Sequence, residues 1–303
     1  MEKPRPIWQD LPRHLKVYVA GKLGDKSRQS LRQCSKTDRD VVDSIPFSIH
    51  SVVLGPNNPS EATLVVTTEL SHSVRHLPYK TAIRDFINLI KNPKSKMNFV
   101  TFGLENPMCK LYSELIAEFQ KLKIRANRFA LNGVAWPGKL GDDQIELLKL
   151  MDTKVLKVIE ISPTLNDEFL RKLVETEQWK SVRGVSLCTE NCENVDLESF
   201  FHLREINLRG FQQLNEEAKI KIIENFRQRD LPVNSFFYIS KPSVPIGLAM
   251  EERENLEEYE MSTPGNKLIV EDFGNKIHGR VISEKDPEIY LNMDQLFIQM
   301  HNM

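Results

Sequence analysis

The sequence predicts an α/β protein in which a small three-helix N-terminal unit precedes a curved domain of repeated strand–helix pairs. Apolar residues recur at helical spacing within the first 45 residues, and short apolar triplets recur along the middle of the sequence. Helix-capping residues and acidic first turns lie between the triplets. The protein has 303 residues, of which 40% are hydrophobic, enough for a sizeable core and about two domains.

The first predicted helix begins at the Leu11–Pro12 pair, after the polar residue Asp10. Its apolar stripe repeats every four residues: Leu11, Leu15, Val19 and Leu23. A second helix is expected over 27–34. The third begins with a capping box over 35–38 and stops at Pro46. A unit of about 40 residues is at the lower limit for burying its own core, so we expect another surface to cover part of it.

The internal repeat has the pattern apolar-x-x-apolar-x-apolar and occurs six times, at intervals of 29, 30, 26, 21 and 30 residues. The triplets are Met97/Val100/Phe102, Ala126/Phe129/Leu131, Leu156/Ile159/Ile161, Val182/Val185/Leu187, Leu203/Ile206/Leu208 and Val233/Phe236/Tyr238. Helices are expected over 111–122, 142–151, 166–175 and 216–228, with Asn166 and Asn215 as caps. This spacing is typical of leucine-rich-type repeats, and one strand per helix predicts a parallel sheet.

The residues between the inward apolar positions should form the concave face of such a curved sheet, and concave faces of this kind recognise proteins. The candidate target-binding residues are Phe99, Arg128, Val158, Glu160, Glu205, Asn207 and Phe237. The alternative is a compact α/β domain in which these positions are merely solvated.

The remaining segments are expected to be simple connections. A hairpin over 49–66 turns at residues 55–59, and a helix follows over 81–90. Residues 251–260 hold six glutamates and are expected to form a solvated helix or loop. A final hairpin is expected over 267–282, followed by a short helix over 291–300.

Residues 8–44 resemble an F-box in the form found in the FTH family, which is expanded in nematodes. The Leu11–Pro12 start, the LRQCSK segment at 31–36 and the Asp43–Ser44 end carry the resemblance. Residues 177–180 (EQWK) and 199–203 (SFFHL) resemble the FTH region of the same family. The predicted organisation is an F-box at 1–46, a connecting hairpin at 47–80, an FTH-like repeat domain at 81–240 and a C-terminal region at 241–303.

The resemblance implies a non-catalytic substrate adaptor that binds a Skp-type linker and, through it, the cullin of a ubiquitin ligase. The residues it assigns to linker binding are Trp8, Leu11, Pro12, Leu15, Val19, Leu31, Cys34 and Val41. The target protein is not identified by any residue pattern.

Composition argues against several other classes. The net charge is −1, so no overall field attracts nucleic acid or a membrane surface. The charge is nevertheless uneven: residues 1–46 hold ten Lys/Arg and six Asp/Glu, whereas residues 251–303 hold five and twelve. Four cysteines, without a signal peptide or a long apolar run, indicate a cytoplasmic or nuclear protein.

Motifs for chemistry are weak. Residues 133–139 have phosphate-loop spacing, but Leu140 replaces the magnesium-binding Ser or Thr and Pro137 removes a backbone N–H. Two pairs could contribute metal ligands: Cys188 with Cys192, and His72 with His76, the histidines being placed in a loop or helix start. A buried core cysteine is the simpler interpretation of Cys188. We therefore expect no metal, cofactor or small-molecule ligand.

Two alternatives to the adaptor stay open. The first is a repeat scaffold that binds a partner without any role in ubiquitin transfer. The second is an enzyme on an α/β fold, although no nucleophile–base motif is present in the sequence.

Overall fold

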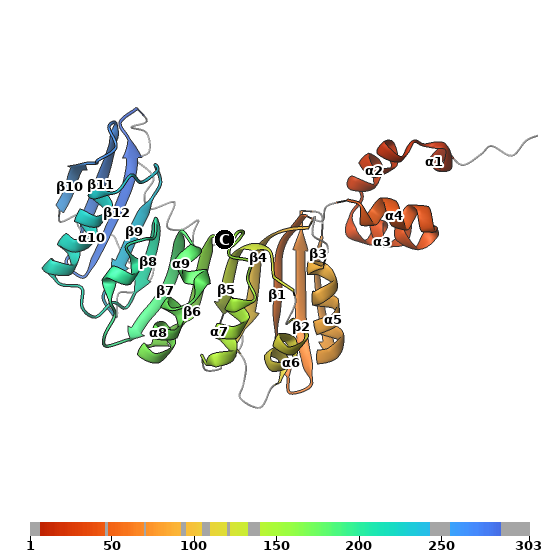
Figure 1. Cartoon of the computed structure of the whole chain (residues 1–303), viewed down its shortest axis with the longest axis horizontal. Coiled ribbons are helices and arrows are strands. Elements are labelled where there is room, and N and C mark those ends of the chain that lie inside the picture. Colours follow the sequence, from red (N-terminus) through yellow and green to blue (C-terminus); the bar gives the residue numbers. More distant parts are fainter. Residues whose placement is uncertain are drawn as a thin grey trace, which may run out of the picture. The chain divides into compact units, whose positions relative to one another are not determined.

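The computed structural model describes residues 7–45, 48–69, 71–91, 95–104, 110–119, 122–132, 140–242 and 255–285. The protein forms two compact units, one of residues 1–139 and 146–156 and the other of residues 140–145 and 157–303. Each unit contains a sheet with helices against it (Figure 1). Within the described ranges, no helix has the length and apolar character needed to cross a bilayer.

The N-terminal unit has one more helix than predicted. A four-residue turn, α1 (Ile7–Asp10), precedes α2 (Arg13–Gly21), α3 (Asp25–Cys34) and α4 (Lys36–Asp43). Pro12 is the N-cap of α2, where its fixed φ is compatible with the start of the helix. The Ser35 hydroxyl accepts the Asp38 N–H at 3.0 Å, so the cap predicted for the last helix is confirmed.

The sheet of the first unit has the order β3-β2-β1-β4-β5. Strands β1 (Ser48–Asn58), β2 (Glu61–Thr68) and β3 (His72–Pro78) are antiparallel, whereas β4 (Lys96–Gly103) and β5 (Ala126–Asn132) continue from β1 in parallel. The strand pairing of the predicted hairpin is confirmed, but its turn lies at residues 59–60 rather than 55–59, because β1 continues through Asn58. The placement of His72 and His76 in a loop or helix start is wrong, because both lie in β3.

One face of this sheet is covered by α5 (Tyr79–Ile90) and α6 (Leu111–Glu118). Phe86 of α5 packs against Phe102 and Phe119, with ring centroids 5.8 and 5.9 Å apart. Tyr112 of α6 lies edge-on to Phe102 and donates its hydroxyl to the Leu54 carbonyl at 3.1 Å. The aromatic core of the first unit is therefore on the helix side.

The sheet of the second unit has the order β6-β7-β8-β9-β12-β11-β10. Its four parallel strands are β6 (Val158–Asn166), β7 (Gly184–Asn191), β8 (Glu205–Arg209) and β9 (Phe236–Ser240). The connecting elements are α8 (Asp167–Val174), α9 (Glu177–Ser181), the 3₁₀ helix η1 (Leu197–Phe200) and α10 (Glu216–Gln228). The parallel repeat of strands and helices is thus present. Its likeness to leucine-rich repeats stays a prediction.

Helix starts follow the predicted caps. Asn166 and Asn215 accept the backbone N–H groups of Phe169 and Ala218 at 2.8 and 2.9 Å. The earlier helix α7 (Asp142–Lys149) begins with two acidic residues, as expected at the positive end of a helix dipole.

The C-terminal region differs from the prediction. Residues 255–260 of the acidic stretch form the strand β10 (Asn255–Glu260), which pairs with β11 (Asn266–Asp272) in an antiparallel ladder. Repulsion between its glutamates is relieved because Lys267 of β11 lies 3.4 Å from Glu258 and 3.8 Å from Glu260. The hairpin of β11 and β12 (Lys276–Ser283) is confirmed. The expected helix over 291–300 and the loop over 133–139 lie outside the described residues.

Five of the six apolar triplets are buried as predicted, and the sixth is in the wrong register. In β9 the residues that face the helices are Phe237 and Ile239, whereas Phe236 and Tyr238 lie on the opposite face and Val233 precedes the strand. A shift of one residue moves every side chain of a strand to the other face. All four residues of the run Phe236–Ile239 are apolar or aromatic, on both faces of the strand, so the sequence pattern could not define which of them point to the helices.

Candidate protein-docking surfaces

The helical unit has its own small core. Ala20, Val41 and Ile45 are buried, and Trp8, Val17 and Leu31 pack against them. Three residues that the resemblance assigned to linker binding, Trp8, Leu31 and Val41, therefore contribute to this interior. Val41 is only 1% exposed and cannot form a surface contact, which corrects its assignment.

Polar contacts hold the short helices together. The Trp8 indole N–H donates to Asp38 Oδ1 at 2.8 Å, and the Ser35 hydroxyl donates to Asp38 Oδ2 at 2.7 Å. These hydrogen bonds, first that of Ser35 and then that of Trp8, lower the pKa of the Asp38 carboxyl. Asp38 thus stays ionised and ties α1 to the start of α4.

Two arginines of α3 connect it to its neighbours. The guanidinium of Arg28 donates to the carbonyls of Ala20 and Gly21 at 3.0 and 2.6 Å, which satisfies the C-terminal end of α2. Arg32 donates to both carboxylate oxygens of Asp43 in α4, at 2.7 and 3.2 Å. The trio of longer helices is therefore positioned by its own contacts.

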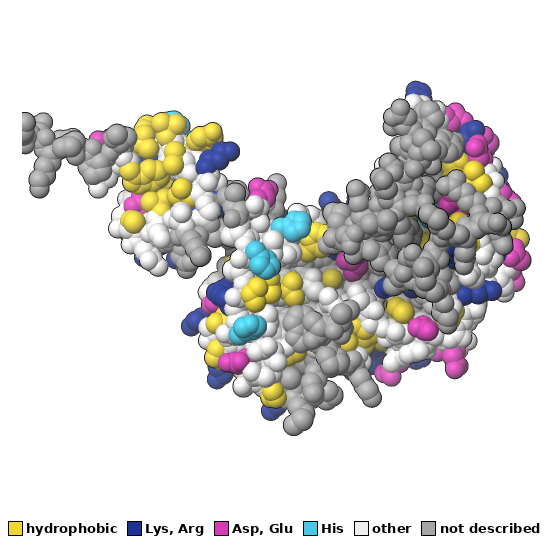
Figure 2. Space-filling model, turned by 180° about the vertical axis from the view of Figure 1, so that it is seen from behind, with side chains coloured by type: hydrophobic (Ala, Val, Ile, Leu, Met, Phe, Trp, Pro, Cys, Tyr) yellow, Lys and Arg dark blue, Asp and Glu magenta, His cyan; other side chains and the backbone are white. Residues whose placement is uncertain are grey.

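The outer face of α2 is apolar and uncovered. Leu15 and Val19 are each 40% exposed, and Tyr18 between them is 66% exposed. These three residues, here called the α2 patch, lie at spacings of three and four and so share one side of the helix. Figure 2 shows hydrophobic side chains gathered on this unit, with basic side chains beside them. The Lys22 ammonium lies 5.7 Å from the centre of the Tyr18 ring.

In the leucine and valine stripe of the first predicted helix, Leu15 and Val19 are thus exposed, whereas Leu23 is half-buried. Pro12 and Cys34 are exposed as well, whereas Leu11 is half-buried. The linker-binding assignment did not include Tyr18. Its spacing from Leu15 was the signal that could have identified it.

The candidate target-binding residues do not form one group. Phe99 and Arg128 belong to the first unit, where the guanidinium of Arg128 stacks 4.9 Å from the Phe99 ring centre. The other five belong to the second unit. Phe237 is fully buried against Phe226 of α10, at a ring distance of 4.9 Å, so its assignment to an outward face is wrong.

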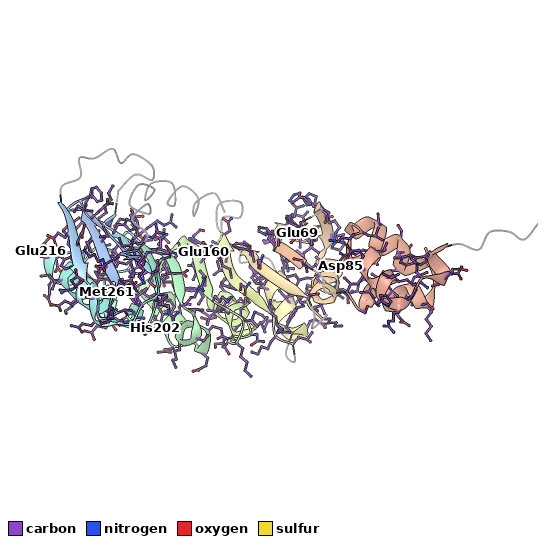
Figure 3. The ribbon with its side chains drawn as sticks, turned by 90° about the horizontal axis from the view of Figure 1, so that it is seen from above. Glu69, Asp85, Glu160, His202, Glu216 and Met261 are labelled. Atoms are coloured by element: carbon purple, nitrogen blue, oxygen red, sulfur yellow. The ribbon has the colours of Figure 1, made fainter. Side chains whose placement is uncertain are left out.

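In the second unit, the face of the sheet opposite the helices is rich in polar groups. Figure 3 shows Glu160 on this face and His202, which lies beside Trp179 of α9, on the other. Glu205 pairs with Arg183 at 3.1 Å, and the Asn207 side chain donates to the Ser186 hydroxyl at 3.1 Å. Val158 is buried there.

The cysteine and histidine pairs give no indication of a metal centre. Cys192 is buried, and this burial raises the pKa of its thiol to about 12, so it stays protonated. His72 and His76 each contact a threonine of β2 at 3.1 Å. In the part of the protein that the structure describes, no three His, Cys, Asp or Glu residues are grouped as metal ligands would be.

Comparison with protein families gives two matches. Residues 8–50 match the F-box domain and residues 139–243 match the FTH domain. The F-box match includes α1–α4 and the first residues of β1, and the FTH match ends after β9, so β10–β12 lie outside it. No curated protein matches this sequence.

Proposed function

Because this chain is an F-box protein of the FTH family, we propose that it acts as the substrate-recognition adaptor of an SCF-type cullin-RING ubiquitin ligase. The helical unit would bind a Skp-type linker and, through it, the cullin. The strand–helix domain would hold the target protein. The site of action would be the cytoplasm, the nucleus or both.

The observation that carries this proposal is the α2 patch. The core of the helical unit is already filled by Val41, Ile45 and their neighbours, yet Leu15, Tyr18 and Val19 remain outside it. Exposed apolar groups that lie together mark interaction surfaces. Pro12 and Cys34 would extend the contact, whereas Trp8, Leu31 and Val41 would act by holding the helices in place.

The adaptor itself would make and break no bonds. Its contribution would be proximity, since a target held by the strand–helix domain meets the ubiquitin-carrying enzyme at a raised effective concentration. The rate of ubiquitin transfer to target lysines would then depend on two independent contacts: that of the helical unit with the linker and that of the strand–helix domain with the target.

The test is binding of the full-length protein to a purified Skp-type linker. Replacing Tyr18 by alanine should weaken the affinity at least tenfold, because centrally placed aromatic residues carry much of the energy of an interface. The matched control is Ile220→Ala on α10, which removes a hydrophobic side chain of similar exposure, 54%, from a surface outside the helical unit. The control should leave affinity unchanged.

Both variants should keep the melting temperature of the wild type, because exposed side chains contribute little to stability. The adaptor function is refuted if the wild-type protein does not bind the linker while another F-box protein does. It is refuted in its stated form if Tyr18→Ala and Ile220→Ala bind equally well. Mass spectrometry of co-purified proteins, with and without proteasome inhibition, would then identify targets.

A further inference from the structure

A row of paired residues crosses the face of the second unit's sheet that lies opposite α8 and α10. This face carries no helix among the residues that the structure describes, and it is here called the helix-free face. The strand registers place six residues from six strands directly opposite one another, here called the cross-strand row: Glu160, Ser186, Asn207, Tyr238, His278 and Glu271. All six have polar side chains. Asn207 is buried and the other five are partly buried, so the polar atoms of this row depend on hydrogen-bonding partners more than those of a fully solvated sheet surface do.

Two residues of this face of β8, Asn207 and Arg209, each have one buried side-chain atom without a hydrogen-bond partner. Asn207 is 6% exposed; its Nδ2 donates to Ser186 but its buried Oδ1 accepts no hydrogen bond. The Nε of Arg209 is buried and has no acceptor. A buried polar atom without a hydrogen-bond partner is costly in free energy. A ligand that donates to Asn207 Oδ1 and accepts from Arg209 Nε would remove this cost.

The charges around this pair are balanced. The face carries five carboxylates, those of Glu160, Glu205, Glu258, Glu260 and Glu271, and five cations, those of Arg183, Arg209, Lys267, Lys276 and Arg280. A polyanion such as nucleic acid is bound through a surplus of positive charge, which this face does not have. A neutral ligand with both a donor and an acceptor fits better.

An extended polypeptide has the right period. Asn207 and Arg209 are two residues apart on one strand, about 6.6 Å along it, and alternate residues of an extended polypeptide present their N–H and C=O groups to the same side at this spacing. Phe236 lies in the neighbouring row, is partly exposed and offers apolar contact to side chains of the ligand.

We propose that the helix-free face of the second unit binds an extended segment of the target protein, with a backbone N–H donating to Asn207 Oδ1 and a backbone carbonyl accepting from Arg209 Nε. This inference rests on the proposed adaptor function, since the segment belongs to the substrate. Tyr238, which lies opposite Asn207 on β9, is half-buried, and rotamer changes of such side chains are common when interfaces form.

The experiment selects peptides from a display library of random twelve-residue sequences, using the full-length protein bound to its Skp-type linker. Selection is repeated with the double variant Asn207→Leu/Arg209→Leu. The matched control is Gln228→Leu/Arg171→Leu, which removes an amide and a guanidinium from exposed positions on the helices α10 and α8. The single variant Arg209→Lys keeps the positive charge but has no Nε donor, and it serves if the double variant does not fold.

Peptides enriched by the wild type should bind the Asn207→Leu/Arg209→Leu variant at least tenfold more weakly and the control equally well. Synthetic copies carrying an N-methyl group at each peptide bond in turn should lose at least fivefold in affinity at one or two positions. The inference is overturned if no peptide is enriched, if the double variant or Arg209→Lys binds as tightly as wild type, or if N-methylation has no effect anywhere.

Linker binding is measured on the same preparations, which separates the two hypotheses. A wild-type protein that fails to bind the linker counts against the adaptor function, and the selection is then made on the protein without the linker. A protein that binds the linker but shows no dependence on Asn207 and Arg209 leaves the adaptor function intact and removes the peptide site.

Discussion

Replacing Lys219 by methionine and Asp272 by asparagine will destabilise the second unit by unequal amounts, although the two residues form one ion pair. The Lys219 ammonium on α10 lies 3.0 and 2.8 Å from the two carboxylate oxygens of Asp272 on β11. It also contacts Glu216 at 2.8 Å. The Lys219 side chain is 5% exposed, whereas that of Asp272 is 29% exposed and that of Glu216 is 80% exposed.

The difference in exposure decides the magnitudes. Lys219→Met leaves a carboxylate that water can reach and keeps the packing of the lysine stem, so we expect a loss of about 1 kcal/mol. Asp272→Asn leaves the buried ammonium with only the exposed carboxylate of Glu216. We therefore expect the free energy of unfolding to fall by about 2–3 kcal/mol, somewhat less than the 3–5 kcal/mol typical of a fully broken buried pair. Asparagine retains an oxygen for the Gly274 N–H that Asp272 accepts at 2.8 Å.

Differential scanning calorimetry measures both effects. For a unit of this size about 1 kcal/mol corresponds to roughly 2–4 °C, so the melting temperature should fall by about 3 °C in Lys219→Met and by about 5–10 °C in Asp272→Asn. Equal losses, or a larger loss in Lys219→Met, would refute the assignment of the energetic cost to the buried ammonium.

The pair also predicts a dependence on alkaline pH. Burial by itself would lower the pKa of Lys219, but the hydrogen bonds that its ammonium donates to Asp272 and Glu216 outweigh burial, and the pKa is raised. A raised lysine pKa adds stability that is fully present below about pH 10.4 and is lost as the pH rises further. The stability difference between the wild type and Lys219→Met should therefore shrink in that range.

Three further variants or measurements test other parts of the molecule. Gly279→Ala should lower the free energy of unfolding by about 1–3 kcal/mol in a thermal melt, because a Cβ there would overlap the Phe237 ring. The pKa of Asp38 is lowered in the folded protein, so the helical unit should lose stability relative to Asp38→Asn as the pH falls below about 3.9, measured by circular dichroism. At pH 8 iodoacetamide should label the exposed Cys34 well before Cys192, whose pKa is raised to about 12, as read by peptide mass spectrometry.

Each of these has a clear contrary result. If Gly279→Ala melts at the same temperature as the wild type, the Phe237 ring can move aside at little cost in free energy. If the wild type and Asp38→Asn lose stability equally as the pH falls, the Asp38 carboxylate adds no stability. Equal labelling of the two thiols in the native protein would contradict the burial of Cys192.

Local signals in the sequence were sufficient for most of the elements. The caps at Ser35, Asn166 and Asn215 work at short range, since a side-chain oxygen accepts an N–H three residues ahead. Five buried triplets located five parallel strands because their alternation is a property of one segment. The acidic β10 was missed, since its stability comes from pairing with β11 and from Lys267, which are not local.

For the functional surfaces, too, some features could be predicted from local sequence and others could not. The sequence alone predicted the α/β class and a small helical unit at the start of the protein, because apolar spacing and helix caps involve only a few neighbouring residues. Only the tertiary structure decided that Val41 is inside and Tyr18 outside, that Phe237 faces α10, and that Asn207 has an unpaired oxygen. Which side of a helix or strand is covered depends on the elements packed against it, and residues distant in sequence supply those elements.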